Sequence, residues 1–206
     1  RSIGLDLSSE EGVQVLYELA KTCDVFLTNK LPEVLEKLLI DVPHIRKHNR
    51  DIIYVRGTAS GPKGPDGNRG GYDMTSFWCR SGIAQSVRPP GMGFVLPQPG
   101  PGFGDSIGGM NIAGGISAAL FHRERTGEAI ELDVSLLSTA WWAAGTSVDI
   151  GLEQGKTMRN IPYRNEYKHA TNFYHRSQPT TDTCSTRQQP KQWIKTHSKS
   201  KHGCTW

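Results

Sequence analysis

The stretch DVFLTNKLPEVLEKLLIDVPHIRKHNRDIIYV, residues 24–55, contains two short apolar runs separated by a charged segment with helical spacing. The runs DVFL (24–27) and IIYV (52–55) are rich in β-branched and aromatic residues, which favours buried strands. Between them, Pro32 fits the first turn of one short helix, and a second is predicted over residues 43–48. Strand, helices and strand in this order predict two parallel strands joined by a crossover connection.

The same alternation continues on both sides of this stretch. Residues 1–7 alternate apolar and polar and predict a further strand, after which a capping box from Ser8 to Glu11 predicts the start of a helix. The elements predicted downstream are a helix over 73–82, a helix over 108–125, a strand over 130–134 and a helix capped by Ser135. The sequence therefore predicts an α/β fold, with a parallel sheet and crossover helices.

Charge is unevenly distributed along the 206 residues, whose formal net charge is +4. Residues 176–206 hold six Lys and Arg against one Asp, so residues 1–175 carry a net charge of −1. A basic pI that comes from the end of the chain is no argument for a nucleic-acid-binding body. Because residues 176–206 are polar and lack any hydrophobic period, we predict a domain over 1–175 followed by a disordered basic tail.

The sequence gives no sign of a membrane span or a metal site. The apolar, uncharged run over residues 134–148 is too short to cross a bilayer. His44 and His48 stand four apart, but no third metal ligand accompanies them. The four cysteines lie far apart without a C-x-x-C pair, which is typical of a reduced compartment. We therefore expect a cytoplasmic protein that holds no metal.

A lone carboxylate, Asp105, stands in the glycine- and proline-rich stretch QPGPGFGDSIGGMNIAGG (98–115), before the helix predicted over 108–125. Bare glycine backbone lets a ligand come close, and a helix N-terminus offers free N–H groups and a positive potential. A carboxylate placed there can act as a nucleophile toward an activated acyl group. The alternative is that Asp105 only caps the helix. Neither glycine-rich loop, residues 57–71 or 102–108, matches a nucleotide-binding motif.

Several segments, read in order, resemble the class III CoA-transferase family, the group of formyl-CoA transferase and carnitine CoA-transferase. They are RSIGLDLSSEEG (1–12), DVFLTNKLPEVLEKL (24–38), RDIIYVRGTASGPKGPDGNRGGYDM (50–74), FGDSIGGMNIAGGISAALFHRERTGEAIELDVSLLSTA (103–140) and, more weakly, TNFY (171–174). The resemblance implies a Rossmann-like large domain. It also implies that this domain is incomplete here, without an upstream strand and without the family's small domain.

The resemblance further implies the transfer of CoA from an acyl-CoA to a carboxylic acid, in an interlocked homodimer. Asp105 matches the family's catalytic aspartate, which forms a covalent aspartyl intermediate. The positions that match family contacts to CoA are Leu5, Asn29, Lys30, Lys37, Leu38 and Tyr72, while Asp73 matches an acidic position near the active site. Where the family usually has Glu-Asn-Phe, this chain has Thr-Asn-Lys at 28–30.

Two other functions fit the same resemblance. One is a 2-methylacyl-CoA racemase, but the racemases carry His before the Asp of the G-Y-D turn. Here that residue is Tyr72, which does not take up a proton at neutral pH. The other is a non-catalytic CoA-binding relic, which would follow from the missing small domain.

Overall fold

The computed structural model describes residues 2–89, 91–155, 175–176 and 184–185. The chain divides into two units, Arg1–Ile161 and Pro162–Trp206. In the second unit, strand β4 (His175–Arg176) pairs antiparallel with β5 (Cys184–Ser185). The predictions made for TNFY and for the tail over 176–206 concern residues that, apart from β4 and β5, lie outside the described ones.

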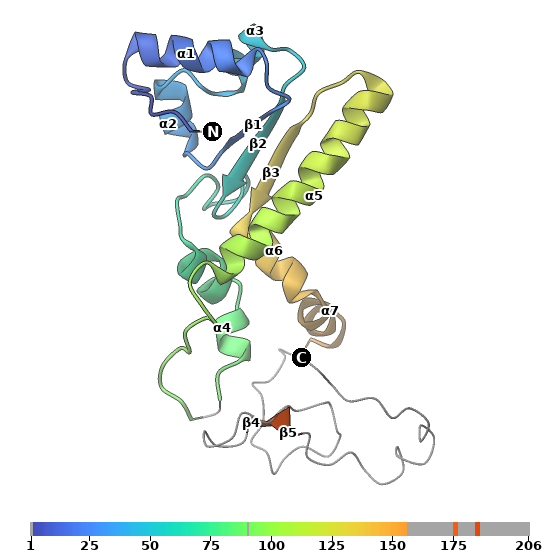
Figure 1. The fold of residues 1–206 in the computed structure, drawn as a ribbon. Helices are drawn as coiled ribbons and strands as arrows, with labels where there is room; N and C mark the ends of the chain where they lie inside the picture. The colour runs from blue at the N-terminus through green and yellow to red at the C-terminus, as the bar shows by residue number, and fades with distance from the viewer. Residues whose placement is uncertain (1, 90, 156–174, 177–183, 186–206) are drawn as a thin grey trace. The chain divides into compact units, whose positions relative to one another are not determined.

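A parallel three-stranded sheet with the strand order β1-β2-β3 runs through the first unit (Figure 1). Its strands are β1 (Val25–Thr28), β2 (Ile53–Thr58) and β3 (Glu131–Ser135). Val25 pairs with Ile53 at one end, and Thr58 pairs with Ser135 at the other. The predicted α/β class, the parallel sheet and the strands over 24–27, 52–55 and 130–134 are confirmed.

The helices of the first unit are α1 (Glu10–Ala20), α2 (Pro32–Lys37), α3 (Val42–His48), the π-helix η1 (Asp73–Cys79), α4 (Ile83–Ser86), α5 (Phe103–Thr126), α6 (Leu136–Ala143) and α7 (Gly145–Gln154). Pro32 occupies the first turn of α2, and Ser135 caps α6 by accepting the N–H of Ser138, both as predicted. Among the helices of the described ranges, none combines the length and apolar content that crossing a bilayer requires.

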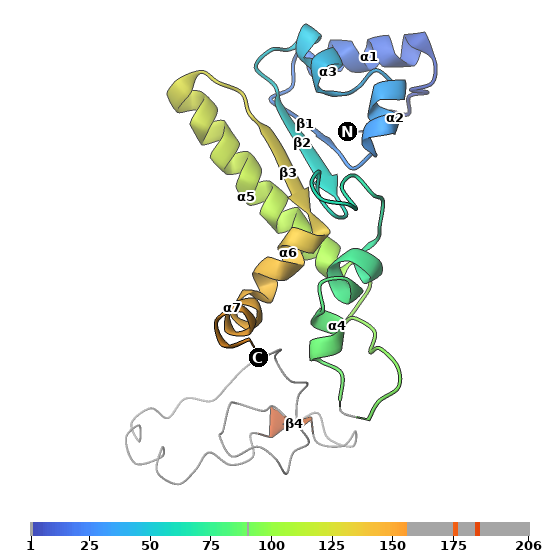
Figure 2. The same cartoon turned by 180° about the vertical axis from the view of Figure 1, so that it is seen from behind.

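The two faces of β2 are buried against different helices (Figures 1 and 2). Ile52 and Tyr54 pack into a core with α1, α2 and α3, whereas Ile53 and Val55 pack against Ala119 of α5. The connection from β1 to β2 contains α2 and α3, and the connection from β2 to β3 contains α5. Both lead in the same direction across the strand order, yet they run over opposite faces of the sheet. They therefore have opposite hands, although such crossovers are right-handed in about 98% of cases.

The N-terminal segment differs from the prediction. Residues 2–6 form no strand, and Ile3 is 64% exposed. Alternation alone does not make a strand, because a strand also needs a neighbour for its backbone hydrogen bonds. The cap of α1 also lies one residue later than predicted. The Asp6 carboxylate accepts the N–H and hydroxyl of Ser8, so Ser9 becomes the cap and accepts the N–H of Gly12 at 3.1 Å.

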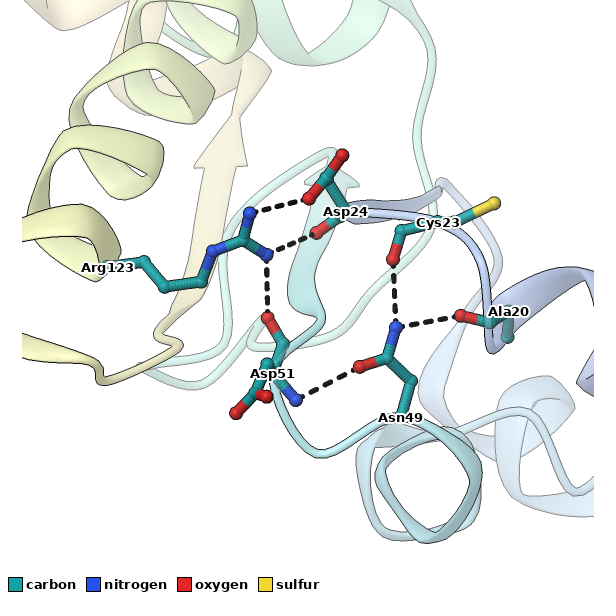
Figure 3. A network of polar contacts seen from close by, with 6 residues as sticks. All are labelled: Ala20, Cys23, Asp24, Asn49, Asp51 and Arg123. Atoms are coloured by element: carbon teal, nitrogen blue, oxygen red, sulfur yellow. Dashed lines mark hydrogen bonds and ion pairs between the residues drawn. The ribbon is translucent and has the colours of Figure 1, made fainter.

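Arg123, near the end of α5, joins this helix to the turns that precede β1 and β2 (Figure 3). Its guanidinium donates to the Asp51 carbonyl at 2.8 Å and to the Asp24 carboxylate at 2.6 Å. Asn49 joins the same two turns by donating to the carbonyls of Ala20 and Cys23 at 2.8 and 2.9 Å. The strands thus start from a common, hydrogen-bonded edge of the sheet.

Tyr54 offers a test of the α1–α3 core. Its buried hydroxyl donates to the Ile40 carbonyl at 2.8 Å, and burial raises its pKa to about 12. We expect Tyr54→Phe to lower the free energy of unfolding by about 1 kcal/mol at neutral pH, because the buried carbonyl loses its partner. In the wild type, a raised folded pKa should make stability fall from about pH 10 toward pH 12. This fall should be smaller in the variant.

Denaturant titrations at several pH values would measure both effects. Tyr72→Phe is the control, since Tyr72 is 82% exposed and should change stability by less than about 0.5 kcal/mol. Equal behaviour of the two variants would contradict the burial of the Tyr54 hydroxyl.

Candidate active site

A cleft of about 1340 Å³ lies where the three parallel strands end. Asn29 and Lys30 follow β1, residues 57–60 end β2 and follow it, and residues 134–136 end β3. The remaining walls come from the loop over 68–71, from η1 and from the first turns of α5. Ligands of open α/β sheets bind outside the carboxyl ends of the strands, so this cleft is the candidate site.

Asp105 lines this cleft in the first turn of α5. The helix begins at Phe103 rather than at 108 as predicted, so Asp105 lies inside it. Gly102 precedes the helix with a φ of 68°, a conformation that glycine adopts without strain. Within the described part of the chain, nothing donates a hydrogen bond to the Asp105 carboxylate, which therefore does not cap α5. The interpretation of Asp105 as only a helix cap is wrong.

The cap of α5 comes from a different helix. Asp73, the first residue of η1, is 8% exposed, and its carboxylate accepts the N–H of Gly104 at 3.0 and 3.2 Å. Gln98 donates its side-chain amide to the same carboxylate at 2.8 Å. The helix predicted over 73–82 is shorter in the structure, where η1 ends at Cys79 and the next helix, α4, begins only at Ile83.

Gly104 has no room for a side chain. A Cβ there would lie 2.2 Å from the Phe77 ring and 2.3 Å from Asp73 Oδ1. The aromatic ring of Phe103 packs edge-on against those of Phe77 and Trp78, which brings the two helices together at this point. The glycine before Asp105 is therefore required by the contact between η1 and α5.

The pKa of Asp105 is raised above its ordinary value. Partial burial is the main cause, and the negative charge of Asp73 is the second. A carboxylate with a raised pKa is more basic when it ionises. The nearby Asp73 also takes up part of the positive potential that the N-terminus of α5 would otherwise offer to Asp105.

The structure brings together five of the predicted site residues, since Asn29, Lys30, Tyr72, Asp73 and Asp105 all line the cleft. The other three do not line it. Leu38 packs against the α1–α3 core, Lys37 is exposed at the end of α2, and Leu5 is half-buried in the N-terminal segment.

Two arginines of the cleft wall, Arg69 and Arg80, are not among the residues predicted for the site. Both form ion pairs with Asp66, at 3.1 Å for Arg69. Hydrogen bonding from Arg69 and the charge of Arg80 lower the pKa of Asp66. No sequence motif connects these two arginines, because one lies in a loop and the other follows η1, and only the fold brings them to the same cleft wall. Across the described ranges, no three His, Cys, Asp or Glu side chains gather into a possible metal site.

The fold and the cleft define an α/β protein with a candidate ligand site at the carboxyl edge of a parallel sheet. Comparison with known proteins specifies the family. Residues 1–190 match the sequence model of CoA-transferase family III, and the chain belongs to this family. Its fold is that of the class III CoA-transferases, as predicted from the resemblance.

Individual relatives agree with this assignment. The chain is 32% identical over 148 residues to (R)-2-hydroxy-4-methylpentanoate CoA-transferase from Clostridioides difficile, covering 72% of this chain and 37% of that protein. It is 34% identical over 139 residues to succinyl-CoA:glutarate CoA-transferase from Mus musculus, covering 68% and 31%. A CAIB/BAIF family protein from Brucella suis has a similar structure, with a TM-score of 0.72 and 27% identity over 78% of this chain and 42% of that one. The chain thus spans less than half of these relatives.

The close contact at Gly104 predicts a large effect of a single methyl group. Gly104→Ala should destabilise the protein by about 1–3 kcal/mol, because Phe77 and Asp73 would have to move. Gly114→Ala is the matched control in the same helix. No atom lies within 4 Å of a Cβ at that position, so helix propensity should stabilise the variant by up to about 1 kcal/mol. Denaturant unfolding measures both. The same sign of change in the two variants would refute the contact.

Proposed function

We propose that the protein to which this chain belongs transfers CoA from an acyl-CoA to a carboxylic acid, with Asp105 as the nucleophile. The observation that carries the proposal is the position of Asp105, exposed at the cleft and without a hydrogen-bond donor among the described residues. A carboxylate that is not used by the fold is available for chemistry. Membership of CoA-transferase family III supports the same reaction class.

The proposed reaction proceeds through covalent steps on the Asp105 carboxylate. A carboxylate oxygen attacks the thioester carbonyl and the C–S bond breaks. CoA departs as a thiolate, and a mixed anhydride between Asp105 and the donor acyl group remains. The thiolate then attacks the Asp105 carboxyl carbon, which releases the donor acid and leaves an aspartyl-CoA thioester. The acceptor carboxylate reverses these steps: it displaces the thiolate to form a new anhydride, and the thiolate attacks the acceptor carbonyl. The product acyl-CoA leaves and Asp105 is restored, without net uptake of a proton.

The proposal assigns CoA to two parts of the surface. Asn29, Lys30 and Tyr72 line the cleft, where the thioester would have to reach Asp105. Leu5, Lys37 and Leu38 lie outside the cleft lining and are proposed to contact the distant, phosphate-bearing end of this long ligand. A lysine suits that end because its ammonium group is a compact point charge.

The proposal includes a cytoplasmic, interlocked homodimer of the whole protein. Trp141 and Trp142 of α6 are 52% and 82% exposed in the single chain, so they are not core residues. Met110 and Phe121 of α5 are also largely exposed. Large apolar side chains on a surface favour association with another chain.

Trapping of the intermediate tests the nucleophile. The protein is incubated with an acyl-CoA, quenched with hydroxylamine or borohydride, and mapped by mass spectrometry. We expect the modification on Asp105, and its loss in Asp105→Asn. Asp149→Asn, in α7 and outside the cleft lining, is the control and should be labelled like the wild type.

The alternatives give different results in this experiment. A folded sample that binds CoA but carries no label on Asp105 would exclude the covalent mechanism. Exchange of the α-proton of a 2-methylacyl-CoA without transfer would indicate a racemase, and binding of CoA with neither labelling nor proton exchange would indicate a non-catalytic CoA-binding relic.

Calorimetric titration with CoA tests the proposed cations. Lys30→Met and Lys37→Met should each weaken binding by about tenfold, equivalent to about 1.4 kcal/mol, through loss of a charge-assisted contact. Lys63→Met is the control, since Lys63 is exposed but does not line the cleft. If all three variants bind CoA equally, the assignment of the CoA site is wrong.

A further inference from the structure

Two aspartates meet at the start of α5, but the structure uses them differently. Asp105 is exposed at the cleft, whereas Asp73 is buried and accepts the N–H of the residue directly before Asp105. The carboxylate of Asp73 is thus linked to Asp105 through a single peptide unit. Burying a carboxylate costs free energy, because the group loses hydration that only hydrogen bonds can replace.

We propose that Asp73 is a positioning residue, which anchors the first turn of α5 and thereby fixes the Asp105 carboxylate at the cleft. The proposal deepens the proposed function, on which its meaning for catalysis rests. Asp73 need not touch a substrate for this role. It acts through Gly104 and through its charge.

The contacts of Asp73 explain how it anchors the helix. Both carboxylate oxygens lie within 3.2 Å of the Gly104 nitrogen, and Gln98 donates to Oδ2 from the loop that leads into α5. The helix start and its entry loop therefore share one acceptor. The other end of the link is also held, since η1 begins with a reciprocal hydrogen-bond pair between Tyr72 and Thr75.

The position of a cap usually falls to the residue just before the helix, which here is Gly102. Glycine has no side chain for this purpose, and an added Cβ at Gly104 would collide with Asp73. The cap is therefore supplied from 31 positions away in the sequence. As a result, Asp105 is the one carboxylate in the first turn of α5, and it is not needed to cap the helix.

The charge of Asp73 also acts on Asp105. It is the second cause, after burial, of the raised pKa of Asp105. The other titratable or charged groups that line the cleft are Lys30 after β1, Arg69 in the glycine-rich loop, and Tyr72, Cys79 and Arg80 in or beside η1. Since Arg69 and Arg80 are paired with Asp66, their positive charge is partly neutralised by that pairing.

The test uses Asp73→Asn, which removes the charge but keeps the shape. The introduced amide can still accept the Gly104 N–H through its oxygen. Gln98 can turn its side-chain amide so that Oε1, which is buried without a partner among the described residues, accepts from the introduced NH₂ group. We expect the pKa of Asp105 to fall in this variant, as measured by ¹³C NMR of labelled aspartate in the free protein. Asp105→Asn assigns the signal.

A second variant separates the anchor from the charge. Asp73→Ala removes the acceptor, so hydrogen exchange at the amides of residues 104–106 should speed up by at least about tenfold, while Asp73→Asn should change it little. Asp66→Asn, which removes a different carboxylate near the cleft, should change neither quantity by as much. In Asp73→Asn, acyl-CoA should continue to label Asp105 at lower pH than in the wild type. In Asp73→Ala, the rate of labelling should be lower at every pH.

The outcomes distinguish this proposal from the proposed function. An unchanged Asp105 titration in Asp73→Asn would overturn the electrostatic role, even if Asp73→Ala fails to fold. Unchanged exchange at residues 104–106 in a folded Asp73→Ala would overturn the anchoring role. If the titration and the exchange respond as expected but acyl-CoA never labels Asp105, the positioning role stands and the covalent mechanism falls.

Discussion

The buried carboxylate of Asp73 accepts the N–H of Gly104, and much of the candidate site depends on this contact. It holds η1 against the start of α5, and it leaves no space for a side chain at position 104. It also satisfies a backbone donor that a helix start otherwise leaves without a partner. Asp105, the next residue, is therefore not needed to cap the helix, and it lies at the cleft.

Helix α5 connects this site to the rest of the fold. Its middle covers Ile53 and Val55 of β2 through Ala119, which has no exposed surface. Its first turns line the cleft at the carboxyl edge of the sheet, and Arg123 fixes its last turns to the opposite edge. Because the helix spans the whole sheet, the position of Asp105 relative to the strand ends is set by core packing as well as by the contact with Asp73.

The parts of the fold that the sequence predicts are those in which the signal is local. The apolar runs at 24–27 and 52–55 become strands that pair with each other, and the second run is buried on both faces. The proline at 32 starts a helix because the N–H that it lacks would have no partner in the first turn of a helix. The alternation of residues 1–7 misleads, since a strand requires a partner that a sequence pattern does not show. The early start of α5 was hidden for a related reason. Its first turn is held by Asp73, which is remote in the sequence.

The candidate site follows the same division. Resemblance to the family points to Asp105 and to cleft residues such as Lys30 and Tyr72, whereas the relation between Asp73 and Gly104 emerges only in three dimensions. Arg69 and Arg80 come to the cleft wall through a loop and a π-helix, for which sequence spacing gives little guidance. The resemblance points to a candidate site, and the contacts show how its residues are held.

The ion pair of Asp24 with Arg123 has a consequence for the order of folding. The two residues are 99 positions apart in the chain. Closing so long a loop costs more chain entropy than closing the short loops among α1, β1, α2, α3 and β2. We therefore expect the core around Tyr54 to assemble from nearby segments first, with α5 and β3 docking afterwards. On that route the cleft is the last part to form, so Asp105 takes its place at the strand ends only once the sheet is complete.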